Sequence, residues 1–137
     1  MSDFVSEIKT IPHNDESIFE MLSDLSNLER VRDRIPQDKV KNFTFDRDTC
    51  SLTFEPIGRV QFKIIERKPN ETIKIQTTNS PVPLTVWIQL KQVAEHDTKM
   101  KITFRADINS FLKPMLSKPL QEAVNKISEL IARLPYE

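Results

Sequence analysis

The stretch from Asn109 to Glu137 constrains the fold of this chain more than any other part of the sequence. Its apolar side chains recur every three or four residues, which is the spacing of one face of an α-helix. These positions are Leu112, Met115, Leu116, Leu120, Ala123, Val124, Ile127, Leu130, Ile131 and Leu134. Asn109 and Ser110 can cap the start of this helix, and Pro119 predicts a kink or a restart within it. A helix with so wide an apolar stripe needs a surface to cover it, and the rest of the chain must supply that surface.

Six segments between Val40 and Ala106 alternate apolar and polar residues, which predicts β-strands with one buried and one solvent-facing side. Short polar turns separate the segments, so neighbouring strands should run antiparallel. A further strand is expected from Phe4 to Ile11, and two short helices are expected between Asn14 and Ile35. The residues predicted to face inward are Phe43, Phe45, Leu52, Phe54, Val60, Phe62, Ile64, Ile73, Ile75, Leu84, Val86, Ile88, Met100, Ile102 and Phe104. The predicted fold is α+β, with a seven-stranded antiparallel sheet wrapped around the long C-terminal helix and two short helices after the first strand.

Length and composition exclude several classes of function. The chain has 137 residues, which is the size of one domain spanning residues 1–137. Lys and Arg together number 20, as do Asp and Glu, so there is no basic excess of the kind that nucleic-acid-binding proteins carry. Gly58 is the only glycine, whereas phosphate-binding loops and dinucleotide sites need several. No cofactor and no nucleic-acid partner are therefore expected.

The single cysteine and the pattern of hydropathy indicate where the protein works. Cys50 cannot form an internal disulfide, which fits a reducing compartment. The first residues, Met1 to Phe4, lack the pattern of a signal peptide, and no apolar run approaches about 18 residues. We therefore expect a cytoplasmic location without stable membrane insertion.

The order of one strand, two short helices, six strands and a long helix resembles the helix-grip fold of the START-related superfamily. That superfamily includes birch-pollen-allergen-like, polyketide cyclase-like and lipid-transfer proteins. The stretch from Ile18 to Leu28 is similar to its first helix and the junction with the second. Two features differ: the glycine-rich loop of the plant allergens is absent, and no tryptophan follows the junction near Arg30 to Arg32. The resemblance implies an apolar cavity between the sheet and the C-terminal helix, and it implies no catalytic residue.

An inward face almost free of polar residues, together with this resemblance, predicts a binding site for a small hydrophobic ligand. A lipid, an isoprenoid or an aromatic polyketide-like compound would fit such a site. The residues expected to line the cavity are Phe43, Phe45, Leu52, Phe54, Phe62, Ile64, Ile75, Thr77, Val86, Ile88, Met100, Ile102, Phe104, Phe111, Met115, Leu116 and Leu120. The same side chains could instead touch one another in a packed core, and the sequence leaves both possibilities open.

The outer face of the predicted sheet suggests a function of a different class. The alternation directs Trp87, the only tryptophan, away from the long helix, with Thr85 and Gln89 beside it. An exposed tryptophan would favour a protein-interaction module, comparable to the superfamily members that act as co-chaperones. A bulge after Pro83 would reverse the alternation and bury Trp87 instead.

A cyclase-like or hydrolase-like enzyme has the least support from the sequence, although catalysis stays open. His13 and His96 fall in predicted turns without metal-ligand partners nearby, so no metal site is expected. Cys50 lacks a catalytic signature and is expected to pack as a small apolar side chain. Asp24 is expected to stabilise the junction between the two short helices.

Overall fold

The computed structural model describes residues 2–34, 40–55 and 57–136. Its strands pair in the order β1-β8-β7-β6-β5-β4-β3, with β2 also pairing with β8, and every pairing is antiparallel. The strands are β1 (Ser2–Val5), β2 (Lys9–Ile11), β3 (Val40–Phe45), β4 (Thr49–Phe54), β5 (Gly58–Lys68), β6 (Thr72–Asn79), β7 (Leu84–Ala94) and β8 (Asp97–Ala106). The helices are α1 (Asp15–Leu22), the 3-10 helix η1 (Leu25–Arg34) and α2 (Lys113–Ala132). The predicted helix-grip architecture is confirmed.

The predicted first strand is divided, so the sheet has eight strands instead of seven. β1 and β2 both pair with β8, and Ser6 lies between them. The Ser6 amide donates to the Ile102 carbonyl (2.9 Å), and the Ser6 hydroxyl accepts from the Ile102 amide (3.0 Å). These two bonds keep the interrupted segment attached to β8.

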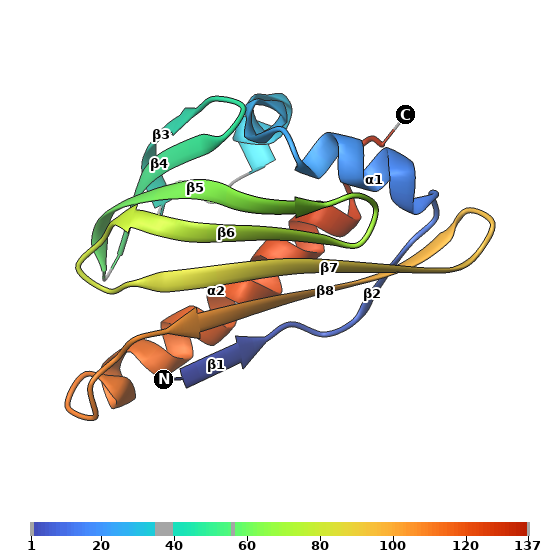
Figure 1. Cartoon of the computed structure of the whole chain (residues 1–137). Coiled ribbons are helices and arrows are strands. Elements are labelled where there is room, and N and C mark those ends of the chain that lie inside the picture. The colour runs from blue at the N-terminus through green and yellow to red at the C-terminus, as the bar shows by residue number, and fades with distance from the viewer. Residues whose placement is uncertain (1, 35–39, 56, 137) are drawn as a thin grey trace.

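α2 crosses the inner face of the sheet, which is the face turned away from the viewer in Figure 1. It packs most closely against β8, β1 and β2. The residues that α2 buries against the sheet are Leu116, Leu120, Val124, Ser128 and Ile131. The helix begins at Lys113, later than expected, because Asn109 first closes a turn by accepting from the Leu112 amide. Of the kink or restart expected at Pro119, the restart does not occur, because the helix continues through this residue.

α1 and η1 close one end of the space between the sheet and α2. Ile18 is fully buried, and Phe19, Leu22 and Leu25 are nearly so. Asp24 stabilises the junction as predicted, because its carboxylate accepts from the Ser26 amide (3.0 Å). The end of the predicted second helix, at Ile35, lies outside the described residues.

Arg67 fixes this junction to the sheet. Its guanidinium donates to the Ser23 carbonyl (2.9 Å) and to the Asp48 carboxylate (2.5 Å). One side chain on β5 therefore ties the helical unit to the turn between β3 and β4.

Side chains from helices bond to backbone carbonyls on both outermost strands of the sheet. On β1, the Val5 carbonyl accepts from the Gln121 amide group of α2 (3.0 Å). On β3, the Phe43 carbonyl accepts from the Arg32 guanidinium of η1 (3.4 Å). The register of β3 also shifts between Lys41 and Thr44, where Asn42 has a positive φ of 57°.

Candidate ligand-binding site

The inner face of the sheet is tightly packed under α2 and less covered along β4 and at Phe62 of β5. Met100 and Ile102 on β8 are 1% and 0% exposed, and Leu120 opposite them on α2 is 1% exposed. The inward side chains of β4, and Phe62 of β5, are instead only half-buried. These half-buried residues, which we call the β4–β5 patch, are Cys50, Leu52, Phe54 and Phe62. The patch is apolar surface that the protein's own core does not fully cover.

The residues predicted to line a cavity separate into distinct groups in the structure. Nine are buried in the core: Ile64, Ile75, Val86, Ile88, Met100, Ile102, Phe104, Leu116 and Leu120. Leu52, Phe54 and Phe62 belong to the β4–β5 patch. The buried group packs as a core, so the patch is the part of the predicted set with apolar surface left for a ligand.

Phe111 and Met115, also predicted to line the cavity, lie at the surface. Phe111 is 86% exposed and lies just before α2, and Met115 is 61% exposed and lies in the first turn of α2. Figure 1 places the beginning of α2 at the same end of the sheet as the β4–β5 and β6–β7 turns. The opposite end is the one that α1 and η1 close. Two exposed apolar side chains therefore lie at the end of the fold opposite α1 and η1.

Phe43 and Phe45 are occupied by a contact that the sequence did not predict. Their rings stack with centroids 5.9 Å apart, and the Arg32 guanidinium lies 5.6 and 5.4 Å from the two centroids. An arginine over two aromatic faces gains cation–π energy and holds η1 against β3. These two phenylalanines thus join η1 to the edge of the sheet.

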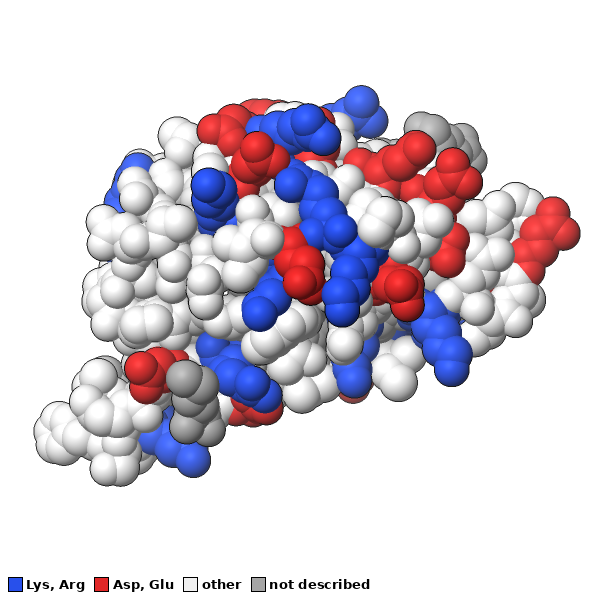
Figure 2. Space-filling model, in the orientation of Figure 1, with Lys and Arg blue, Asp and Glu red and all other residues white. Residues whose placement is uncertain are grey.

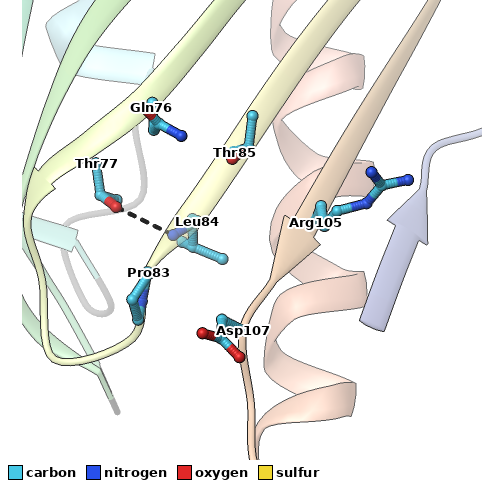
Figure 3. Close-up of a pocket in the computed structure, with 7 residues that line it drawn as sticks. All are labelled: Gln76, Thr77, Pro83, Leu84, Thr85, Arg105 and Asp107. Carbon is cyan, nitrogen blue, oxygen red and sulfur yellow. Dashed lines mark hydrogen bonds between the residues drawn. The ribbon is translucent and has the colours of Figure 1, made fainter. Parts of the chain in front are cut away.

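Two depressions are described on the sheet, and the second includes two residues of the β4–β5 patch, Cys50 and Phe62. The first has a volume of about 170 Å³ and is lined by Gln76, Thr77, Pro83, Leu84, Thr85, Arg105 and Asp107 (Figure 3). The second, of about 210 Å³, is lined by Thr44, Thr49, Cys50, Ser51, Gln61, Phe62 and Thr78. The Thr77 hydroxyl, predicted to face the ligand, accepts instead from the Leu84 amide (3.1 Å) beside the first depression. Both volumes are below the roughly 300 Å³ that a drug-sized ligand needs.

Cys50 is the titratable side chain of the β4–β5 patch. Burial raises the pKa of the Cys50 thiol to about 12, so this thiol is a poor nucleophile at neutral pH. Within residues 2–34, 40–55 and 57–136, no three His, Cys, Asp or Glu side chains are grouped to hold a metal ion. None of the described helices is both long and apolar enough to cross a membrane.

Trp87 faces outward, as the alternation predicts, and it is half-buried. The Lys74 ammonium lies 5.4 Å from the centroid of its ring, and the Arg105 guanidinium lies 5.1 Å from it. Lys74 is the direct cross-strand partner of Trp87, and Arg105 pairs with Thr85, two residues before Trp87 on β7. These contacts depend on the register between strands, which the alternation of apolar and polar residues does not fix.

Comparison with known proteins supports the fold. No family model matches the chain, and no curated protein matches it in sequence. Solved structures do match: norcoclaurine synthase from Thalictrum flavum, in complex with dopamine and hydroxybenzaldehyde, superposes with a TM-score of 0.71 and 13% identity. That match covers 96% of this chain and 86% of the synthase.

Two further structures agree. A START superfamily protein from Mycobacterium smegmatis has a TM-score of 0.64 and 9% identity, covering 97% of this chain and 99% of that one. A conserved protein from Geobacillus kaustophilus has a TM-score of 0.69 and 13% identity, covering 96% and 93%. The chain has the START-related helix-grip fold. At these identities the likeness establishes the fold alone.

Proposed function

We propose that this START-related protein binds a small hydrophobic ligand over the β4–β5 patch, at the end of the fold where α2 begins. The observation that carries the proposal is the half-burial of Leu52, Phe54 and Phe62 on a face whose other side chains are almost fully buried. Exposed Phe111 and Met115 add apolar surface at the end where α2 begins. The structural neighbour crystallised with dopamine and hydroxybenzaldehyde supports a small aromatic or otherwise apolar molecule as the ligand class.

The exposed apolar area of the patch is small, so it supports only modest binding affinity unless the ligand is large. Each of these Leu and Phe side chains is only partly exposed, so covering one contributes about 0.5–1 kcal/mol. Three such residues therefore account for about 2 kcal/mol, and the apolar area of the ligand must supply the rest. The described depressions do not enclose a ligand, so binding would require an open groove or a movement of the first turns of α2. The single cysteine fits our inference that the protein works in the reducing cytoplasm.

Titration with N-phenyl-1-naphthylamine, an uncharged dye that fluoresces in apolar surroundings, tests the proposal. Wild type should enhance the fluorescence, and Leu52→Glu should abolish the enhancement because it places a charge in the patch. Ile65→Glu is the matched control, since Ile65 is 47% exposed on the adjacent strand β5 and lies outside the patch. Met115→Glu should also weaken binding, and its exposed position leaves the core intact if Leu52→Glu fails to fold. Unchanged dye binding in both Leu52→Glu and Met115→Glu would refute the proposed site.

We also propose a second function, in which the outer face around Trp87 is a protein-interaction surface. The half-buried indole, with Lys74 and Arg105 on it, favours this candidate because Trp and Arg are enriched at interface hot spots. Affinity purification from lysate with wild type and Trp87→Ala as baits tests it. Identical sets of captured proteins would remove its support.

A further inference from the structure

Positive charge on the outer face gathers around Trp87, although the chain as a whole is neutral. Figure 2 shows Lys and Arg side chains in a band over the middle of this face, with fewer acidic ones among them. Lys74, Lys91 and Lys101 form no ion pair with any described residue, and Lys91 lies directly opposite Lys99 on the next strand. Like charges placed opposite each other cost stability. Lys74 contacts the Trp87 ring and lies opposite Glu66 on β5, so Lys91 and Lys101 are the cations of this group without a described acidic partner.

Arg105 connects this charged area to the first depression. Asp3 holds its guanidinium through two bonds, Nε to Oδ1 at 2.8 Å and Nη2 to Oδ2 at 3.2 Å. The same side chain lies over the Trp87 ring and lines the depression with Gln76 and Thr85. In Figure 3 these residues lie on the outer side of β6, β7 and β8, with Asp107 just beyond the end of β8. The indole, the cations and the depression form one continuous surface.

The pattern of charge on this surface indicates the chemistry of a partner. Lys101 has no described acidic partner, whereas Arg105, four residues and about 13 Å farther along β8, is already paired with Asp3. An extended segment lying along β8 would therefore meet an available cation at Lys101 and a neutralised one at the depression. Asp107 repels a carboxylate at the depression, so an uncharged side chain fits there. The uniform negative charge of a nucleic-acid backbone would meet both Asp3 and Asp107, and this disfavours it.

We propose that the outer face binds an acidic, extended segment of a partner protein, with carboxylates over Lys74 and Lys101 and an uncharged side chain in the depression beside Arg105. This inference rests on the second proposed function, the interaction surface around Trp87. Ion pairs to Lys74 and Lys101 would supply the specificity and the salt dependence, and the indole would supply the contact area.

Trp87 is the only tryptophan, so its fluorescence reports directly on this surface. The probe is a decapeptide with alternating glutamate and serine in one half and serine alone in the other half, so that an uncharged side chain can enter the depression. Its control carries glutamine in place of each glutamate. The acidic peptide should change the Trp87 emission saturably, and raised salt should weaken the effect. The double variant Lys74→Gln/Lys101→Gln should bind about tenfold more weakly, because each exposed ion pair contributes a factor of a few. Lys118→Gln/Lys126→Gln changes the net charge equally on exposed positions of α2 and should bind like wild type.

Three results would overturn the inference. They are the absence of any emission change, an equal loss in both double variants, and binding of a single-stranded oligonucleotide or phosphatidylserine vesicles in place of the peptide. A failed peptide titration combined with Trp87-dependent capture of partners would reject the acidic segment and leave the interaction surface standing. Failure of both experiments would reject both proposals.

Discussion

The two halves of the inner face carry the same alternation of apolar residues, yet they reach different degrees of burial. On β8, Met100 and Ile102 are almost inaccessible, whereas Leu52 and Phe54 on β4 are half-buried. α2 packs most closely on β8, β1 and β2. Inward side chains farther across the sheet, such as Val60 on β5 and Ile73 on β6, are also almost inaccessible, so the less covered region is confined to β4 and Phe62. An alternating pattern thus tells which side of a strand faces inward and does not tell what covers it.

The largest expected effect tests the covered half. Leu120→Ala should lower the free energy of unfolding by about 2–5 kcal/mol, because it removes a fully buried side chain and leaves a cavity. Met115→Ala, five residues earlier on the same helix and exposed, should change it by less than about 0.5 kcal/mol. Urea denaturation followed by circular dichroism gives both values. Ile127 is on the predicted apolar stripe but 38% exposed, so the same truncation there should cost less than at Leu120. Equal losses at Leu120 and Met115 would mean that the two ends of α2 are packed alike.

The next largest expected effect is on the reactivity of Cys50, which lies in the less covered half of the inner face. Its pKa of about 12 in the folded chain exceeds the ordinary 9.0, because burial disfavours the thiolate. At pH 8 the folded protein therefore presents roughly a thousandfold less thiolate than the unfolded chain, and alkylation by iodoacetamide should slow accordingly. The raised pKa also makes the free energy of unfolding depend on pH. The neutral Cys50 thiol stabilises the fold fully below about pH 9, and this stabilisation is lost as the pH rises toward 12.

Mass spectrometry of the alkylated protein, with a urea-unfolded sample as control, measures this ratio. A folded-state rate close to the unfolded rate would show that the β4–β5 side opens freely. The two halves of the inner face would then differ in how often they open as well as in how deeply their side chains are buried.

The smallest expected effect is a difference in hydrogen exchange within α2. Pro114 and Pro119 each remove a backbone donor from the first half of the helix, and the apolar side chains there are less buried. Amides of residues 111–118 should exchange well before those of 124–133, through local opening at a free energy below that of global unfolding. A bound apolar ligand should slow the first group most. Equal protection of both groups would describe a rigid helix and would exclude entry of a ligand by opening of its first turns.

The fold could be predicted because its signals are local. Alternation, short polar turns and the helical stripe from Leu112 to Leu134 each depend on neighbouring residues, and together they gave the element order and the inward sets. The division of the first strand could not be predicted, because it depends on a contact with a distant residue. The Ser6 hydroxyl accepts from the Ile102 amide where a regular strand would use a backbone group.

Less of the candidate site could be predicted, because it depends on contacts between distant segments. Phe43 and Phe45 were assigned to a ligand, yet Arg32 reaches them from η1. The exposure of Phe111 depends on where α2 begins, and Asn109 shifts that start by closing a turn first. Of these features, the contact between Lys74 and Trp87 was the easiest to predict. It requires only the register between β6 and β7, which places the two residues opposite each other.

The bonds from Gln121 to Val5 and from Arg32 to Phe43 have a consequence for colloidal behaviour. A chain built mostly of strands can polymerise when a lateral strand recruits a strand from another molecule. Here each lateral strand has a carbonyl already occupied by a helix side chain, and β3 is further distorted at Asn42. A strand that adds at either flank would meet these helix side chains, so the helices that hold the domain together also hinder edge-to-edge pairing of its copies.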